Sequence, residues 1–435
     1  MMLVYFILGT CFITLRGDGA VVPDQTVDDT APRITRQPES VLIFRDSLAT
    51  SIDLQCEAGN VPNPRYQWYK NYDTKFRIHL DLGTDRRYSF TKGRLTISNP
   101  DVNVDPGDYR CVASNQYGSV ISNPARIQTG FLNKFSDGVR KNVTGHLFGH
   151  LVLDCKTPLN YPGVEYTWYK DDQPLQDDLK IYVFPSQNGR LYFSYFMASG
   201  KFVCSVTLKK PQSDGSVPQT ENSTAINVLF TNQGSHYNHD TSVLPRFPEE
   251  LPAVFPYPPM KGEELKIECA AFGRAKSYSW TKADGGLPAK VRYEQFNRVL
   301  VIPDAKLEDS GLYTCTAHGR VFLTPGEYDN HKSFNLTVQA KPYFTQILKD
   351  ERVTEGSKVS WRCEANGEPT PSYTWIKNQQ IIQPIPGDIE IKDNVLTIHA
   401  AYQRRGGLYQ CQATNIHGST YTSAQLRVFD AKVIG

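Results

Sequence analysis

The sequence predicts an all-β protein built from four tandem two-sheet sandwiches. The phrase YRCVASNQYG at 109–118 returns as YQCQATNIHG at 409–418, and weaker copies occur at 313–320 and 202–208. Another cysteine precedes each copy, and a tryptophan follows that cysteine at a nearly constant distance. Short alternating runs such as SIDLQCEA, interrupted by Pro, Gly and Asn, are typical of strands, and no stretch keeps a helical period. Repetition of this kind indicates a repeated domain.

Each repeat has the order Cys, Trp, Cys, and three of the four have a tyrosine two residues before the second cysteine. This order is typical of the immunoglobulin-like sandwich, here of I-set type, in which a disulfide joins the sheets and the tryptophan packs against it. The tyrosine hydroxyl is expected to tie the corner before strand F, which Phe202 of the second repeat cannot do. The predicted core residues are Trp68, Trp168, Trp280, Trp375, Tyr109, Tyr313 and Tyr409.

Nine cysteines are present, and Cys11 lies in the apolar run 3–15, which small residues follow. This pattern is typical of a secretory signal peptide, although its start carries no lysine or arginine. Its removal leaves eight cysteines, an even number that suits an oxidising compartment. The expected disulfides are Cys56–Cys111, Cys155–Cys204, Cys269–Cys315 and Cys363–Cys411. Zinc is a poor alternative, because its ligands cluster a few residues apart.

The repeats predict two coupled pairs of domains with a joint between them. Cys204 and Cys269 lie 65 positions apart, whereas the corresponding cysteines at the other two boundaries between domains lie 44 and 48 positions apart. The additional residues between Cys204 and Cys269 are polar and rich in Pro and Gly, which is typical of a linker. The predicted division is a signal peptide at 1–20, domains at 33–128 and 131–230, a hinge linker at 231–245, and domains at 246–339 and 341–429.

Several stretches resemble the first four immunoglobulin domains of the contactins. They are GFLNKF at 130–135, NYPGVEYTWYKDD at 160–172, QNGRLYFS at 187–194, AAFGRAKSYSWTKADGGLP at 270–288 and VSWRCEANGEPTPSYTW at 359–375. Similar four-domain heads occur in the neuroglian and neurofascin group and in insect hemolin. The resemblance implies a horseshoe, with domain one against four and domain two against three. An extended rod of four domains is the alternative.

The contactins continue into further immunoglobulin domains, fibronectin type III domains and a lipid anchor, which this sequence does not contain. Either a soluble short form or a fragment of a longer product is therefore expected. No apolar run after the signal is long enough to span a bilayer. The expected location is secreted, or at the cell surface if the chain is a fragment of an anchored protein.

No catalytic residue, metal site or cofactor is expected, and the chain is not expected to be an enzyme. The sequence has no nucleophile motif or phosphate loop. The pairs His146 with His150 and His236 with His239, the latter beside Asp240, are interpreted as solvated loop histidines. The RGD tripeptide at 16–18 falls at the end of the signal peptide. A net charge of +2 gives no attraction to nucleic acid or to anionic membranes.

Binding to other proteins is therefore the expected function. The resemblance implies a contactin-like role in cell adhesion and axon guidance, with cell-surface partners that are either identical chains or other immunoglobulin-superfamily members, and a monomer or weak homo-oligomer. The alternative is a soluble, hemolin-like defence or pattern-recognition protein. An intracellular muscle-type scaffold is disfavoured by the signal and the disulfides. Three sequons predict glycosylation at Asn142, Asn222 and Asn335.

Overall fold

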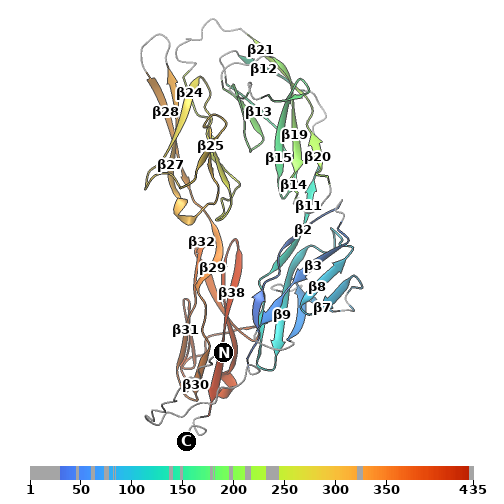
Figure 1. The fold of residues 1–435 in the computed structure, drawn as a ribbon, viewed down its shortest axis with the longest axis vertical. Helices are drawn as coiled ribbons and strands as arrows, with labels where there is room; N and C mark the ends of the chain where they lie inside the picture. Colours follow the sequence, from blue (N-terminus) through green and yellow to red (C-terminus); the bar gives the residue numbers. More distant parts are fainter. Residues whose placement is uncertain are drawn as a thin grey trace, which may run out of the picture.

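The computed structural model is almost entirely β-structure in its described residues, and 3₁₀ turns occur at η4 (Leu307–Asp309) and η5 (Gln403–Arg405) (Figure 1). The predicted signal peptide with Cys11 and the RGD tripeptide, the pair His236 and His239 with Asp240, and most of the hinge lie outside the described residues. The structure describes residues 30–45, 49–59, 64–72, 78–81, 83, 85–136, 141–146, 150–176, 180, 182–194, 199–210, 217–231, 244–320 and 327–430.

The first sandwich shows how alternation in the sequence makes a half-buried sheet. In β3 (Ser51–Gln55), Ile52 and Leu54 are buried and Asp53 faces solvent, as the two-residue period of a strand requires. One sheet has the order β11-β9-β5-β6, with β2 and β10 alongside, and the facing sheet has the order β3-β8-β7, with β1 paired to β4. The other bounds are β1 (Arg33–Arg36), β2 (Val41–Phe44), β4 (Glu57–Gly59), β5 (Arg65–Lys70), β6 (Ile78–Leu80), β7 (Tyr88–Thr91), β8 (Arg94–Ser98), β9 (Gly107–Asn115), β10 (Gly118–Ile121) and β11 (Ala125–Leu132).

The second and third sandwiches repeat this plan. In the second, the order β12-β21-β19-β15-β16, with β20 alongside, faces β13-β18-β17, and in the third, β24-β27-β28 faces β22-β23-β26-β25. The bounds in the second are β12 (Lys141–His146), β13 (Leu151–Asp154), β14 (Asn160–Tyr161), β15 (Val164–Lys170), β16 (Gln173–Pro174), β17 (Val183–Pro185), β18 (Arg190–Phe193), β19 (Gly200–Leu208), β20 (Thr220–Asn222) and β21 (Ile226–Thr231). Those in the third are β22 (Ala253–Phe255), β23 (Leu265–Glu268), β24 (Ala275–Lys282), β25 (Arg292–Glu294), β26 (Val299–Ile302), β27 (Gly311–Arg320) and β28 (Glu327–Leu336).

The fourth sandwich faces β30-β38-β37-β33-β34 with β31-β36-β35, and β29 pairs with β32. Its bounds are β29 (Ala340–Gln346), β30 (Glu351–Thr354), β31 (Val359–Arg362), β32 (Glu364–Glu368), β33 (Ser372–Lys377), β34 (Gln380–Ile381), β35 (Ile389–Lys392), β36 (Val395–Ile398), β37 (Gly407–Asn415) and β38 (Gly418–Phe429).

Each core is centred on a disulfide and a tryptophan, at the positions that the sequence predicts. The structure joins Cys56–Cys111, Cys155–Cys204, Cys269–Cys315 and Cys363–Cys411, and Trp68, Trp168, Trp280 and Trp375 are all buried. The hydroxyls of Tyr109, Tyr313 and Tyr409 donate to the carbonyls four residues upstream at 2.7–2.8 Å. In the second domain the buried Phe202 packs edge-on against Phe193 instead.

The joints within each pair of domains are tight. Strand β11 runs through the predicted boundary at 128–131, and its end, Leu132, is buried in the core of the second domain together with Phe44. Between the third and fourth domains, the backbone of Gln339 bonds to Pro259 and Lys261 at 2.7 Å, and its side chain bonds to His417. Neither pair of neighbours therefore has slack in its linker.

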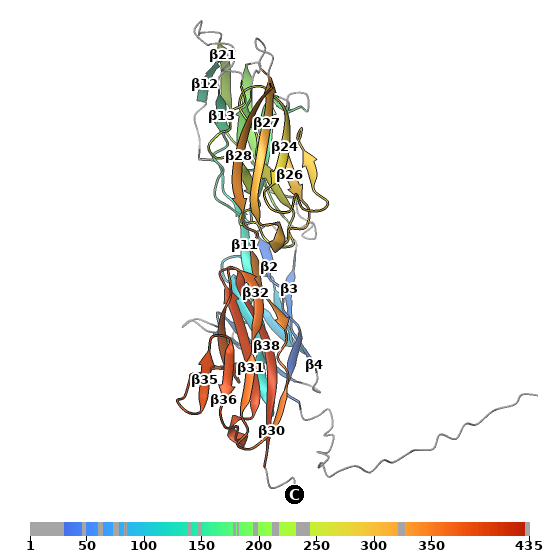
Figure 2. The same cartoon turned by 90° about the vertical axis from the view of Figure 1, so that its left-hand side faces the viewer.

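The two pairs of domains lie side by side with the chain folded back. In Figure 1 the strands of the first domain lie beside those of the fourth, and those of the second beside those of the third. Figure 2 shows the same two tiers, with domains two and three above domains one and four. Hydrogen bonds cross between domains in both tiers, from domain one to the distant domain four in the lower tier and from domain two to the next domain, domain three, in the upper tier.

Trp375→Ala should lower the local unfolding free energy of domain four by about 3–5 kcal/mol, because it removes a large side chain from a closed core. The measurement is amide hydrogen exchange of β37 in the intact protein. The matched control is Tyr402→Ala, whose side chain is exposed and should change exchange very little. Equal effects of the two substitutions would contradict the assignment of Trp375 to the core.

Candidate sites at the contacts between domains

The contact between domains one and four is made by the residues immediately before the second cysteine of each domain. Arg110 Nη1 donates to the hydroxyl of Tyr421 at 2.6 Å, and the guanidinium lies over the tyrosine ring. Gln410 accepts from the Ile121 backbone N–H at 3.0 Å and donates to the Ile121 carbonyl at 3.2 Å. Only 3% of Arg110 and 1% of Gln410 is exposed. Both side chains are thus buried polar groups with partners in the other domain.

These two sets of contacts occupy equivalent places in the repeat. Arg110 corresponds to Gln410 and Ile121 corresponds to Tyr421 when the phrase at 109–118 is aligned with its copy at 409–418. Because cysteine side chains point into the core, the neighbouring residues on the strand point to the outer face of the sheet. The contact therefore has an approximate two-fold relation between the two domains. The repeated phrase forms both the core and the interdomain surface.

The centre of this contact is apolar and close-packed. Ala31, Ala113, Val120 and Leu408 form one buried cluster. Gly118 has a φ of +155°, and a Cβ there would lie 2.8 Å from the Cβ of Leu408, so a side chain cannot fit. The rim is polar: Gln379 donates to the Ser119 hydroxyl at 3.0 Å, and Arg33 pairs with Asp350. A cavity of about 650 Å³ opens at the seam between the two domains.

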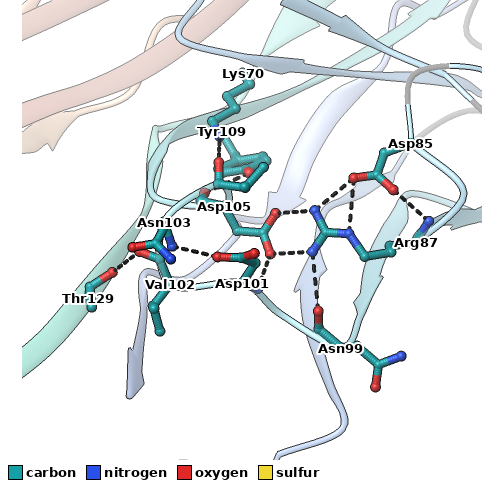
Figure 3. A network of polar contacts seen from close by, with 11 residues as sticks. Lys70, Asp85, Arg87, Asn99, Asp101, Val102, Asn103, Asp105, Tyr109 and Thr129 are labelled. Carbon is teal, nitrogen blue, oxygen red and sulfur yellow. Dashed lines mark hydrogen bonds and ion pairs between the residues drawn. The ribbon is translucent and has the colours of Figure 1, made fainter. Parts of the chain in front are cut away.

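A charged network holds the corner that precedes strand F of domain one (Figure 3). Arg87 donates to both oxygens of Asp105, at 2.8 and 2.9 Å, and also to Asp85 at 2.7 Å. Asp105 is fully buried, and its carbonyl accepts the hydrogen bond from Tyr109. These hydrogen bonds raise the pKa of Arg87 further above its ordinary value. The network fixes the corner and is not open to a ligand.

Domain four has the same corner with its charges exchanged. Arg405 stands in the place of Asp105, and it pairs with Asp388. Its carbonyl accepts from the Tyr409 hydroxyl at 2.7 Å. In domains one and four an ion pair therefore lies below the tyrosine, with the acid and the base on exchanged positions. The spacing of the cysteines and tyrosines in the sequence does not predict either of these two ion pairs.

Domains two and three meet through the opposite sheets. The buried cluster here comprises Phe184, Tyr192, Leu251, Ala270, Val299 and Val301, from β17, β18 and β26 and their surroundings. Arg190 and Tyr192 both bond to Glu250, at 2.7 and 3.1 Å. The upper tier thus uses the β13-β18-β17 and β22-β23-β26-β25 sheets, whereas the lower tier uses strands β9, β10, β37 and β38.

Glu268 is a buried carboxyl at the contact between domains two and three. It accepts hydrogen bonds from the Ser186 hydroxyl and, at 3.0 Å, from the Gln187 backbone N–H, both in the other domain. Burial raises the pKa of Glu268 to about 7, although these hydrogen bonds and the charge of Lys266 act in the opposite direction. The ionisation state of this contact therefore changes near neutral pH.

Of the remaining residues considered from the sequence, the three sequon asparagines lie at the surface and His150 lies at this same contact, whereas the side chain of His146 is outside what the structure describes. Asn142, Asn222 and Asn335 are exposed, which leaves each open to a glycan. His150, interpreted as a solvated loop histidine, also stacks on Phe272 of domain three with ring centroids 4.6 Å apart. His150 is still partly exposed, and burial together with the charge of Arg246 lowers its pKa.

The part of the chain that the structure describes contains neither a cluster of metal ligands nor a membrane-spanning helix. No group of three or more His, Cys, Asp or Glu side chains in that part of the chain could hold a metal ion. Among the same residues, no helix has the length and apolar character to cross a membrane.

Comparisons with known proteins agree with this architecture. The immunoglobulin I-set domain model matches residues 342–428, and an immunoglobulin domain model matches 31–115 and 254–318. Contactin-5 of Rattus norvegicus is 30% identical over 410 residues, which are 93% of this chain and 35% of the relative. Contactin-3 of Rattus norvegicus is 32% identical over 403 residues, 91% of this chain and 37% of the relative. The chain thus spans about a third of the length of these relatives.

Solved structures with four tandem domains share the fold. The insect immune protein hemolin aligns with a TM-score of 0.64 at 21% identity, over 92% of this chain and 100% of that one. Immunoglobulin domains 1–4 of Sidekick-1 align with a TM-score of 0.65 at 19% identity, with the same coverage. The chain belongs to the immunoglobulin superfamily. Within this superfamily it is a contactin-like four-domain head, as the resemblance of its motifs predicts.

Gln410→Ala should weaken the contact between domains one and four by about 1–3 kcal/mol, because it leaves the Ile121 N–H and carbonyl buried without a partner. Amide hydrogen exchange at Ile121 and its neighbours should accelerate. The control is Gln346→Ala, an exposed glutamine of the same domain. Unchanged exchange at Ile121 would show that the contact does not depend on this side chain.

The contact between domains two and three should loosen as the pH rises from 5 to 8. The pKa of Glu268 is higher in the closed contact than when solvated, so closure binds a proton and its contribution is lost as the pH rises through about 7. Glu268→Gln should remove this part of the pH dependence, whereas Glu264→Gln, at an exposed ion pair, should retain it. His150 acts in the opposite sense and is present in both variants.

The measurement is small-angle scattering across this pH range, with the maximum dimension as the readout. A wild-type profile that does not change with pH, or a Glu268→Gln profile that changes as the wild type does, would contradict the assignment.

Proposed function

We propose that this chain is the recognition part of an extracellular cell-adhesion protein that binds other cell-surface proteins by surface complementarity, without catalysis. The similarity to contactins over more than nine-tenths of the chain supports an adhesion role. The four disulfides fit an oxidising, extracellular compartment. A contribution to axon guidance, and binding either to identical chains or to other immunoglobulin-superfamily members, form part of the proposal.

The proposal includes the horseshoe as the shape in solution and the division into domains at 33–128, 131–230, 246–339 and 341–429, with 231–245 as the hinge. The contacts across both tiers support it. Because these contacts are intramolecular, each experiences an effective concentration in the millimolar range, and modest interfaces suffice to keep the chain folded back. The buried polar pairs then select one arrangement over others, since any other arrangement leaves them without partners.

One observation supports the location of the proposed binding surface. Among the residues that the structure describes, some sheets neither contact another domain nor carry a sequon. All three sequons lie on the sheets of domains two and three that face away from their mutual contact, on β12, β20 and β28. Glycans there would shield these faces from proteins. In domains one and four, the uncovered sheets are β3-β8-β7 and β31-β36-β35, and neither carries a sequon. These two faces are the proposed surface for partners.

A glycan placed on the proposed surface should abolish binding to cells. Asp53→Asn with Gln55→Thr creates a sequon on β3, at an exposed position. The matched control, Thr281→Asn with Ala283→Thr, creates one on β24, in the shielded sheet of domain three. The measurement is binding of the fluorescent secreted chain, and of beads coated with it, to cultured neurons. The expected result is loss of binding with the first glycan only.

Two other outcomes of this experiment would contradict the proposal. Loss with the domain-three glycan only would place the surface on the sheet that we consider shielded. No binding of the unmodified chain to any cell surface or to itself would contradict the adhesion role. The alternative function, a soluble defence protein of hemolin type, is supported only by the shared fold at 21% identity. No feature of the contacts between domains favours it.

A further inference from the structure

The contact between domains two and three contains a buried cation, Arg298, which has no carboxylate partner among the residues that the structure describes. The guanidinium of Arg298 is only 3% exposed. It donates from Nε to the Gln295 carbonyl at 2.9 Å, from Nη1 to the Val183 carbonyl at 3.2 Å, and from Nη2 to the Lys180 carbonyl. These are three of its five N–H groups, and a carbonyl brings no compensating charge. Burial lowers the pKa of Arg298 to about 10.

A cavity of about 360 Å³ opens beside this guanidinium, between the two domains. Domain two contributes Tyr182 and Ser194, and domain three contributes Gly273, Arg274, Ala275, Lys276, Tyr278, Phe296 and Arg298. Three of these nine described lining residues are basic and none is acidic. The volume is within the range of small-molecule sites. An excess of basic over acidic side chains among the described lining residues favours an anion in this concave, partly desolvated space.

The wall of the cavity also provides apolar ring faces and hydroxyl groups. Phe296 and Tyr182 remain 57% and 41% exposed although both rings border the cavity. The Tyr278 hydroxyl accepts from the Ala271 N–H at 3.1 Å, which leaves its own proton to donate. A β-bulge between Ala275 and Ser277 interrupts the pairing of β24 with β27 at this edge. Bulges of this kind re-aim side chains beside binding sites.

We propose that this cavity binds an anionic sugar, with its carboxylate or sulfate at Arg298 and Lys276 and its ring against Phe296 and Tyr182. The planar guanidinium suits a carboxylate or sulfate, which can accept two parallel hydrogen bonds. The negative π-faces of the aromatic rings attract the C–H edge of a pyranose. A neutral sugar lacks the group that would balance the buried charge. This inference is independent of the adhesion role.

The experiment is isothermal titration of the intact secreted chain at low salt with four probes. They are a sulfated uronate-glucosamine disaccharide, sialyllactose, lactose, and a phosphotyrosine peptide. The first two should bind and lactose should not, and the tighter of the two identifies sulfate or carboxylate as the favoured anion. Binding of lactose with equal affinity, binding of the peptide but neither acidic sugar, or no binding of any probe would overturn the proposal.

Two substitutions locate the site. Lys276→Gln removes an exposed charge and should weaken binding about tenfold or more, whereas Lys290→Gln, an exposed lysine of the same domain outside the cavity, should not. Arg298→Lys keeps the charge but loses the planar fork and should also weaken binding. If Arg298→Lys disturbs the fold, Lys276→Gln still decides the outcome. Equal affinity of Lys276→Gln and the wild-type chain would place the sugar elsewhere.

Discussion

The folded-back arrangement depends on polar side chains that are buried in one domain and satisfied by another. Gln410 bonds to both backbone groups of Ile121, and Glu268 accepts from Ser186 and Gln187. A buried polar group left unpaired costs about 1–3 kcal/mol, whereas apolar patches tolerate sliding. The apolar clusters at the two contacts therefore favour association of the domains in many relative positions. The polar groups that bond across each contact favour one of these positions. Tight joints at Leu132 and Gln339 limit how far either pair can depart from that position.

Most of the fold within each domain could be predicted from the sequence. The disulfides, the buried tryptophans and the three tyrosine corners follow from spacing, because they are local to one repeat and their chemistry allows few alternatives. The exchange of charges at the corner could not be predicted in this way. Arg87 with Asp105 and Asp388 with Arg405 fill the same place with opposite signs, so no fixed residue type marks it.

The contacts between domains are harder to predict from the sequence than the fold of each single domain. Arg110 and Gln410 are polar residues on alternating strands, which is also the pattern of a solvated face. Their burial depends on a surface 300 positions away in the chain. The available signal was the repeat itself, since domains one and four are the most similar pair. For Glu268 and Arg298 even that signal is missing, because their partners across the contact belong to domain two, the copy that departs furthest from the pattern.

The two tiers differ in how they respond to their surroundings. The lower tier is held by the amide hydrogen bonds of Gln410 and by Arg110 on the hydroxyl of Tyr421. The upper tier contains Glu268, whose pKa of about 7 ties closure to proton binding. The cavity at Arg298 needs both upper domains, so an anion bound there stabilises the same closure. Protons and the proposed anionic ligand therefore act on one contact, while the lower tier fixes the relative position of domains one and four, whose uncovered faces form the proposed partner surface.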